Sequence, residues 1–321
     1  MKTLKRQAPE LIPGTKLTGK WHGQTYRVIK KLGQGATGTV FLVESERGPL
    51  ALKIGHENPS ITSEVNVLQR FSKVQDVKLG PSLIETDDLK IGDESFAFYT
   101  MEYIRGAPFF SHINKYGKEW GSIFIVQLLG DLDRLHQASW VFGDLKPDNL
   151  LITSSPPRVR WFDVGGTTLM GRSIKEYTEF FDRGYWGLGD RKAEPSYDLF
   201  SVAMVMINIA YPHRFEKGQA EGLEILTERI EAHTWLRPYR KVLRTALLGR
   251  YTDAQLMKKD MMEIISETDS KKRFSSSTKN RMKQGKQFKK TEGKRGNVWD
   301  AMLAASFIIL ASVLYWVGQL M

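Results

Sequence analysis

Cysteine is absent from this chain of 321 residues. Its absence excludes a disulfide framework, a cysteine-based zinc site, an iron–sulfur cluster and a thiol nucleophile. Acidic residues are also in deficit, since 36 Asp and Glu stand against 47 Lys and Arg and leave a formal net charge of +11. A hydrophobic content of 41% excludes disorder throughout and allows one large or two small globular units. The positive charge favours an anionic partner, either nucleic acid or an anionic membrane surface.

Acidic residues are almost missing from residues 271–296. This segment holds eleven Lys and Arg and a single acid, Glu292, for a net charge of +10. Residues 1–270 carry 36 basic and 34 acidic residues, hence only +2. The segment has two aromatic side chains, Phe274 and Phe288, and too little apolar surface to offset the entropy cost of folding. We predict a basic disordered linker over residues 271–298.

Charge of either sign is missing from residues 301–321. A helix of this length is about 31 Å long at about 1.5 Å per residue, which matches the apolar core of a bilayer. Trp299 precedes the run, and Tyr315 and Trp316 lie near its end, where interfacial aromatic residues are expected. An amphipathic or core helix is the alternative. We predict a single transmembrane helix over residues 299–321.

Residues 1–14 lack the apolar centre of a signal peptide, so we expect insertion from the C-terminal end. The positive charges of residues 271–296 lie on the N-terminal side of the run and predict that this side is cytoplasmic. The expected location is therefore the cell membrane, with a single pass. Two partners remain open for the linker. Anionic lipid would contribute about 1 kcal/mol per Lys or Arg, and nonspecific DNA would contact the cations and aromatic rings.

The first third of the chain is rich in β-type apolar segments, at residues 26–32, 39–43, 50–54 and 96–103. Later residues follow a helical period, as in the apolar stripe of Ile125, Leu128, Leu129, Leu132 and Leu135. The pattern predicts an α+β fold with two lobes. A small β-rich lobe would occupy residues 1–104, and a larger helical lobe residues 105–270.

Glycines at positions 33, 35 and 38 lie between two strand-like segments. This spacing allows backbone amides to approach phosphate oxygens, although a plain Gly-rich hairpin turn is the alternative. A dinucleotide-binding fold needs a helix directly after the glycines. Residues 39–43 are β-branched and apolar, which argues against that fold.

Lys53 lies on a strand pattern between Leu52 and Ile54. Such a lysine is ordinarily an edge charge unless it has a partner. The helix expected over residues 60–72 offers Glu64 on its apolar face, and an inward carboxylate needs a cation. We therefore predict a Lys53–Glu64 ion pair that holds the ammonium against nucleotide phosphates.

Residues 142–152 read FGDLKPDNLLI, and Asp163-Val164-Gly165 follows. Phosphoryl transfer needs a carboxylate that takes the proton of the attacking hydroxyl, oxygen ligands for a metal ion, and cations over the phosphate. Asp144 can supply the first. Asn149 with Asp163, and Lys146 with Lys53, can supply the others.

These motifs, in this order, resemble those of bacterial Hanks-type Ser/Thr protein kinases over residues 25–265. The resemblance implies a bilobal protein-kinase-like fold, protein substrates, autophosphorylation, and the use of ATP with Mg²⁺, or Mn²⁺ as an alternative. By the same resemblance, Asp198 would brace the catalytic loop. Residues 176–200 with the terminal segments are similar to kinases of spore-forming bacilli, which implies a role in sporulation.

The resemblance also implies which residues form the site. The residues that would bind ATP are Gly33, Gly35, Gly38, Val40, Ala51 and Lys53, with Met101, Glu102 and Tyr103 as the hinge. The catalytic residues would be Lys53, Glu64, Asp144 and Lys146, and the metal ligands Asn149 and Asp163.

The sequence also departs from the family pattern. Phe142-Gly143 replaces the usual His-Arg, so the arginine that grips an activation-loop phosphate is absent. Activation by crowding on DNA or membrane, with a transient homodimer or oligomer phosphorylating in trans, is the expected substitute. Arg250 resembles the late arginine that pairs with the Glu ending the activation segment. Ala193-Glu194-Pro195 permutes the family's Ala-Pro-Glu, and Tyr185-Trp186-Gly187 is the alternative register for this part of the segment. Thr178 is one of several activation-segment hydroxyls that could be autophosphorylated.

Two other functions share this fold. Gly143-Asp144 also resembles the motif of small-molecule phosphotransferases, whereas a lysine two residues after the Asp, as at Lys146, is typical of Ser/Thr protein kinases. A pseudokinase scaffold is the third reading. It is disfavoured because Lys53, Asp144, Asn149 and Asp163 are all present.

Overall fold

The computed structural model describes residues 9–35, 37–56, 58–72, 79–218, 221–268 and 270. The chain divides into two units, Met1–Glu263 and Ile264–Met321, and the first holds all the elements discussed below apart from the end of a helix that begins at residue 254. Among the described residues, no helix is both long and apolar enough to cross a membrane. The linker predicted at residues 271–298 and the transmembrane helix predicted at 299–321 lie outside the described residues.

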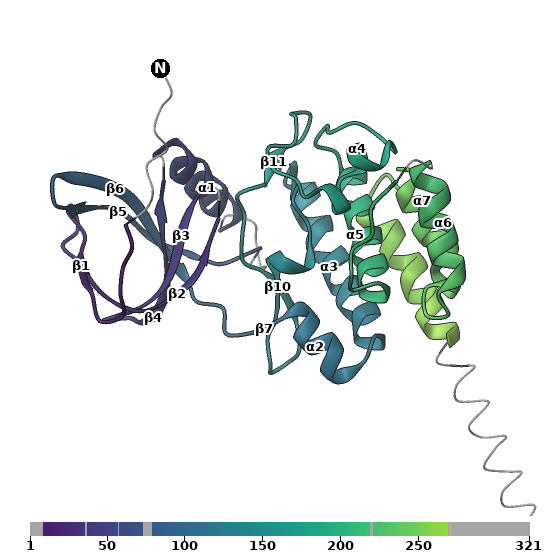
Figure 1. The fold of residues 1–321 in the computed structure, drawn as a ribbon, viewed down its shortest axis with the longest axis horizontal. Helices are drawn as coiled ribbons and strands as arrows, with labels where there is room; N and C mark the ends of the chain where they lie inside the picture. The colour runs from purple at the N-terminus through teal and green to yellow at the C-terminus, as the bar shows by residue number, and fades with distance from the viewer. Residues whose placement is uncertain are drawn as a thin grey trace, which may run out of the picture. The chain divides into compact units, whose positions relative to one another are not determined.

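A six-stranded antiparallel sheet forms the first lobe, in the order β1-β2-β3-β4-β6-β5 (Figure 1). Its apolar side chains, among them Val43, Leu52 and Phe98, form a core on one side of the sheet. The strands are β1 (Lys16–Thr18), β2 (Thr25–Gln34), β3 (Gly38–Ser45), β4 (Gly48–Gly55), β5 (Leu83–Ile91) and β6 (Glu94–Glu102). Four of them match the strand-like segments of the sequence. Strand β5 was not predicted, because acidic residues interrupt its apolar alternation.

The two outer edges of this sheet meet. Gly19, just after β1, forms an isolated β-bridge with Leu89 of β5, and the Lys20 amide donates a 2.8 Å hydrogen bond to the Asp88 carbonyl. Strands at opposite ends of the sheet order are therefore joined, and the sheet closes on itself along a seam between the β1–β2 turn and β5.

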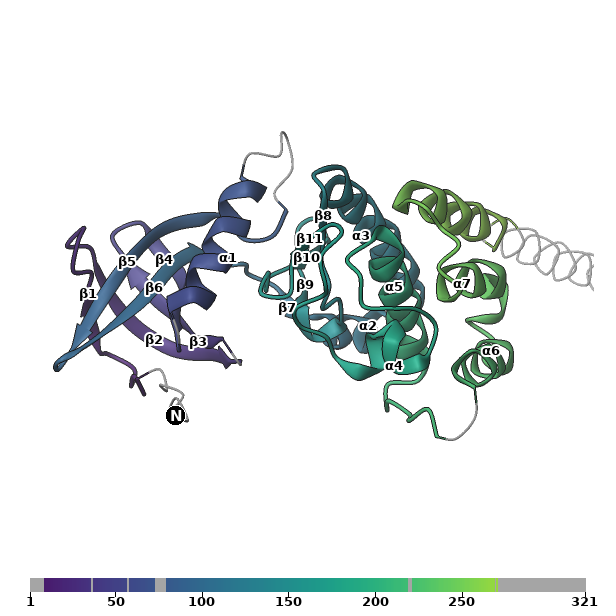
Figure 2. The same ribbon diagram turned by 90° about the horizontal axis from the view of Figure 1, so that it is seen from above.

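One helix, α1 (Asn58–Phe71), belongs to this lobe and packs against β4, β5 and β6 (Figure 2). Its apolar residues Ile61, Val65 and Leu68 are buried. Glu64 lies on the same side of the helix and is only 3% exposed. The helix thus carries a carboxylate inward, as the sequence pattern predicts.

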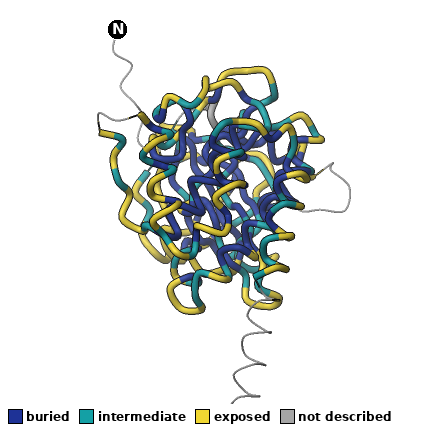
Figure 3. The backbone as a smooth tube through the Cα atoms, turned by 90° about the vertical axis from the view of Figure 1, so that its right-hand side faces the viewer, coloured by how far each residue is buried: buried dark blue, intermediate teal, exposed yellow. Residues whose placement is uncertain are grey.

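The second lobe is mainly helical. Its central helix α5 (Pro195–Ala210) is buried almost all round, with Leu199, Val202 and Met206 fully enclosed, as expected of a helix that is apolar on every face. The predicted stripe of α3 is buried throughout. The helices are α2 (Phe109–Tyr116), α3 (Glu119–Gln137), α4 (Arg183–Trp186), α5 (Pro195–Ala210), α6 (Gly222–Ala232), α7 (Arg240–Leu247) and a further helix from residue 254. Figure 3 shows the buried backbone running through the interior of this lobe beneath exposed loops.

Short elements between the lobes carry the motifs of the sequence. Two small sheets are formed, one in the order β10-β9-β7 and one of β11 with β8. The strands are β7 (Ala107–Pro108), β8 (Trp140–Val141), β9 (Leu150–Ile152), β10 (Val159–Trp161) and β11 (Thr168–Leu169), and the 3₁₀ turns are η1 (Pro147–Asn149), η2 (Glu179–Phe181) and η3 (Arg237–Tyr239). The two-lobed α+β architecture is confirmed.

Candidate active site

The glycine-rich segment forms the hairpin between β2 and β3. The Gly35 amide donates a 2.9 Å hydrogen bond to the Gly38 carbonyl. A Cβ at position 38 would lie 2.3 Å from the carbonyl oxygen of Ile54, so only glycine fits there. At positions 33 and 35 a Cβ would meet no atom within 4 Å of the described structure. Packing against the described residues does not demand those two glycines, and both are exposed, so a ligand can approach their backbone.

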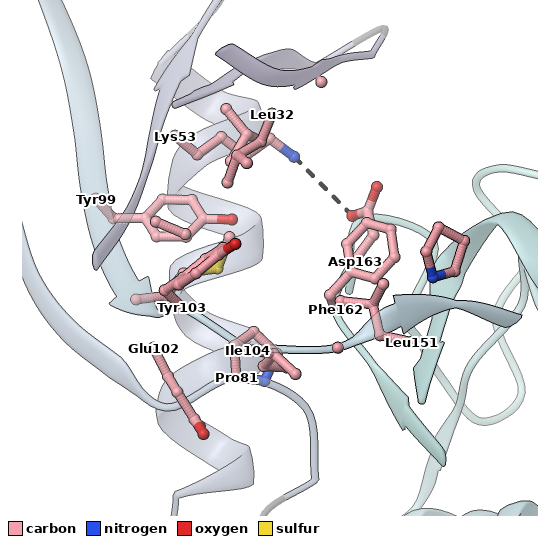
Figure 4. Close-up of a pocket in the computed structure, with 16 residues that line it drawn as sticks. Leu32, Lys53, Pro81, Tyr99, Glu102, Tyr103, Ile104, Leu151, Phe162 and Asp163 are labelled. Atoms are coloured by element: carbon pink, nitrogen blue, oxygen red, sulfur yellow. Dashed lines mark ion pairs between the residues drawn. The ribbon is translucent and has the colours of Figure 1, made fainter. Parts of the chain in front are cut away.

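A cavity of about 270 Å³ lies between the hairpin and the second lobe (Figure 4). Its lining includes Gly33, Val40, Ala51, Lys53, Met101, Glu102 and Tyr103 of the predicted site, whereas Gly35 and Gly38 lie outside the lining. The lining also includes Leu32, Leu151 and Phe162, which were not predicted from the sequence. In Figure 4, Leu151 and Phe162 approach the cavity from the second lobe, opposite Leu32. Two apolar walls facing each other suit a flat ring such as adenine.

Lys53 and Glu64 form a buried ion pair at the inner end of the cavity. The Lys53 ammonium lies 2.7 Å from Glu64 Oε2 and 2.8 Å from Oε1, and both side chains are almost fully enclosed. The same ammonium lies 4.0 Å from Asp163 Oδ1, the contact drawn as a dashed line in Figure 4. One cation therefore faces two carboxylates from different lobes.

Tyr99 supports this pair from β6. The antiparallel register places Tyr99 opposite Lys53, and its phenol donates a 2.6 Å hydrogen bond to Glu64 Oε2. Burial, and then the negative charge of Glu64, raise the pKa of Tyr99 well above its ordinary value. Tyr99 thus stays a hydrogen-bond donor, and Glu64 is held by two groups rather than one.

Asp144 lies at the centre of a second hydrogen-bonded group. Lys146 Nζ lies 2.5 Å from Asp144 Oδ2, and the Thr178 hydroxyl donates a 3.0 Å hydrogen bond to Oδ1. Lys146 also donates a 2.9 Å hydrogen bond to the Thr178 oxygen. Asn149 Nδ2 bonds the Asp144 carbonyl at 2.9 Å. The role of Thr178 was missed because it follows Asp144 by 34 residues, with no local motif between them.

The backbone of the loop before Asp144 is fixed by Asp198 of α5. This fully buried carboxylate accepts hydrogen bonds from the amides of Phe142 at 2.8 Å and Gly143 at 3.0 Å, and lies 2.9 Å from the His136 ring. Gly143 has a left-handed φ of 84°, and a Cβ there would lie 2.6 Å from the Gly166 carbonyl oxygen. Gly143, which stands where the family has an arginine, is therefore required by the conformation of the backbone at this position.

Negative charge accumulates beside Asp163. Burial, and then the charge of Asp163, raise the pKa of Glu176 above its ordinary value, while Lys53 acts in the opposite direction. The Asp163 side chain is 45% exposed, and its Oδ1 accepts a hydrogen bond from the Gly165 amide at 3.0 Å. Asn149 uses its Nδ2 as a donor, so its oxygen can face a cation. A divalent metal ion such as Mg²⁺ binds oxygen ligands, carboxylates above all. Asn149 and Asp163 offer such oxygens, so the residues present fit a divalent metal ion.

The C-terminal part of the activation segment differs from the sequence expectation. Glu194 pairs with Lys192 at 3.1 Å and with Arg183 at 3.7 Å. Arg250, expected to pair with the Glu that ends the segment, is exposed and has no ion pair among the described residues. The Arg183 guanidinium also binds Asp190 at 2.7 Å and Ser196 at 2.8 Å. Arg183, which lies within the activation segment, thus makes the ion pair that was expected of Arg250.

The fold and this site define a protein kinase. The protein kinase domain family model matches residues 26–285, and the chain belongs to this family. The chain is 52% identical to serine/threonine-protein kinase YabT of Bacillus subtilis over 258 residues, which cover 80% of this chain and 76% of that protein. It is 27% identical to serine/threonine-protein kinase PkaB of Streptomyces coelicolor over 42% of this chain and 33% of that protein. The structure of vaccinia related kinase 3 shares the fold, with a TM-score of 0.60 at 16% identity over 82% of this chain and 93% of that chain.

Proposed function

We propose that this protein serine/threonine kinase transfers the γ-phosphate of ATP to protein hydroxyls, its own included, from the cytoplasmic face of the cell membrane. The observation that carries the proposal is the contact of Asp144 with both a lysine ammonium and a threonine hydroxyl. A carboxylate so held can accept the proton of a substrate hydroxyl, while the neighbouring cation faces the phosphate. Membership of the family implies ATP and a divalent metal ion.

Each residue then has one task. Asp144 accepts the proton, and Lys146 offsets charge on the phosphate. Lys53, oriented by Glu64, binds the nucleotide phosphates, and the cavity walls hold the adenine. Asn149 and Asp163 would hold the metal ion, for which we propose Mg²⁺. When bound, the metal ion supplies positive charge that stabilises the negative charge developing on the phosphate oxygens.

Transfer of labelled phosphate from ATP to protein tests this assignment. We expect incorporation into the kinase and into a general protein substrate, abolished by Lys53→Ala and by Asp144→Asn. A small-molecule phosphotransferase would instead consume ATP only with a low-molecular-weight acceptor. A pseudokinase scaffold would give no incorporation with Mg²⁺ present, and that result would remove the enzyme assignment.

The membrane location is part of the proposal and rests on the uncharged run at residues 301–321. We expect the full chain to stay with membranes after carbonate washing at high pH. A chain ending at Asn297 should appear in the soluble fraction. Equal distribution of both chains would contradict a membrane anchor.

The basic linker at residues 271–296 is proposed to bind an anionic partner, either lipid or nonspecific DNA. A chain ending at Asn297 should retard duplex DNA in a salt-sensitive manner, and one ending at Ser270 should not. Vesicles with and without anionic lipid test the lipid alternative with the same two chains. If both chains behave alike with DNA and with vesicles, the linker is not the binding element.

Crowding on such a partner would bring several kinases together. We propose that transient association activates the enzyme by phosphorylation in trans. Specific activity should then rise with enzyme concentration, and rise again when DNA or anionic vesicles are added. Constant specific activity would contradict this step.

A further inference from the structure

A cluster of three potential metal ligands lies at the seam that closes the six-stranded sheet and shares no residue with the lining of the nucleotide cavity. His22 comes from the turn between β1 and β2, and Glu85 and Asp87 come from β5. His22 Nδ1 lies 3.1 Å from Glu85 Oε1 and 3.3 Å from Asp87 Oδ2. The three donor atoms lie within 4.8 Å of one another. The cluster joins the two edges of the sheet at the place where the Gly19–Leu89 bridge brings them together.

Both carboxylates lie on the core-facing side of β5. Residues 85, 87 and 89 alternate onto one face of the strand, and Leu89 is part of the apolar core of this lobe. The Asp87 side chain is only 1% exposed and that of Glu85 16%. No Lys or Arg forms an ion pair with either one among the described residues, so His22 is their only basic partner there. A bound cation would balance the negative charge of the two carboxylates, which only His22 and hydrogen bonds face among the described residues.

Two of the three donor separations suit a small divalent ion. Metal–ligand bonds of about 2.0–2.1 Å in a tetrahedral site place neighbouring donor atoms about 3.3–3.4 Å apart. The two measured separations from His22 Nδ1, 3.1 and 3.3 Å, lie close to this value. One imidazole nitrogen with two carboxylate oxygens is a ligand set that zinc accepts. The His22 side chain is 57% exposed, which leaves a route of entry and room for a water ligand.

The remaining oxygens of the cluster are held in place by other groups. Asp87 accepts backbone hydrogen bonds from Trp21 at 2.9 Å, His22 at 2.9 Å and Asp88 at 2.7 Å. The Tyr26 phenol donates a 2.9 Å hydrogen bond to Glu85 Oε2. Hydrogen bonds of this kind orient the ligands of metal sites.

We propose that His22, Glu85 and Asp87 form a binding site for a divalent transition-metal ion, best suited to zinc. The ion fastens the β1–β2 turn to β5 and closes the seam of the sheet. The site is structural, because it contains none of the residues that line the nucleotide cavity. A hydrogen bond between His22 and the carboxylates has the same spacing, so the test must detect the metal ion itself.

The test is calorimetric titration of the full chain with ZnCl₂. The protein is purified in detergent without a polyhistidine tag and stripped of metal with EDTA. Excess MgCl₂ is present throughout, so that the oxygen ligands of the catalytic cleft are occupied. The variants are His22→Gln and Glu85→Gln. The matched control is His213→Gln, at an exposed histidine outside the cluster.

We expect the wild type and His213→Gln to bind one zinc ion more than His22→Gln and Glu85→Gln. Zinc should raise the thermal unfolding midpoint of the first two proteins only. Tyr26→Phe should keep the site but weaken zinc binding by roughly 10-fold or more, because it removes the hydrogen bond that orients Glu85. If zinc uptake by the wild type equals that of both cluster variants, or if no zinc binds, the proposal is wrong.

Discussion

Tyr99 and Glu64, which are 35 residues apart in the chain, share a 2.6 Å hydrogen bond behind the nucleotide cavity. Lys53 approaches the same carboxylate oxygen at 2.7 Å. The ion pair expected of this family is therefore part of a buried group of three residues from β4, β6 and α1. Because strand pairing holds Tyr99 in place, its hydrogen bond ties helix α1, which carries Glu64, to strand β6.

Tyr99→Phe removes one donor from a buried carboxylate. We expect a loss of about 1.5–3 kcal/mol in the free energy of unfolding, typical of a hydrogen bond to a charged group. The KM for ATP should rise several-fold, because Glu64 then orients Lys53 less firmly. Urea unfolding and steady-state kinetics measure the two effects. Tyr116→Phe, at an exposed tyrosine, is the control and should change neither.

Thr178 tests the hydrogen-bonded group around Asp144. Thr178→Val keeps the shape but removes the hydroxyl that bonds both Asp144 and Lys146. We expect kcat to fall roughly 10- to 100-fold, because the proton acceptor is less well positioned. Thr178→Ser should retain most of the activity. A serine variant as impaired as the valine variant would show that packing, and not the hydroxyl, matters.

Arg183 tests the internal anchor of the activation segment. Its side chain is only 7% exposed and bonds Asp190, Ser196 and the Asp190 carbonyl. Arg183→Lys cannot make these bonds together, and we expect about 1–3 kcal/mol of destabilisation from the unpaired polar groups. Arg250→Ala should stay within about 0.5 kcal/mol of the wild type. The reverse order in urea unfolding would restore Arg250 as the anchor.

His112 gives the fold a pH dependence. Burial, and then the charge of Lys115, lower the pKa of His112 in the folded state, while in the unfolded chain it is about 6.5. The unfolded state thus binds more protons below about pH 6.5, and stability falls as the pH drops through that value toward the folded-state pKa.

His112→Phe removes this dependence. The ring of His112 lies among Tyr116, Trp120 and Phe124, and its buried Nε2 has no hydrogen-bond partner among the described residues. We expect the variant to be more stable than the wild type, by a margin that widens from neutral pH to about pH 5. Urea unfolding at several pH values measures the margin, with His213→Gln as control. A margin that does not change with pH would contradict the prediction.

The sequence determined the chemistry and the order of the parts. Gly33, Lys53, Asp144, Asn149 and Asp163 could be identified because their types and spacing form motifs, which depend on neighbours along the chain. The two-lobed fold followed from the change of period from 2 to about 3.6 residues. Helix α1 and its inward carboxylate could be predicted from the same periodicity, which places Glu64 in line with apolar residues.

The tertiary structure decided which distant residues meet. Strand pairing sets Tyr99 behind Glu64, and the return of the activation segment sets Thr178 on Asp144. Arg183 in place of Arg250, and His22 against β5, are likewise contacts between segments with no common pattern in the sequence. Periodicity and propensity report local order only. Contacts across the fold arise from packing the whole core, and no short stretch of sequence encodes them.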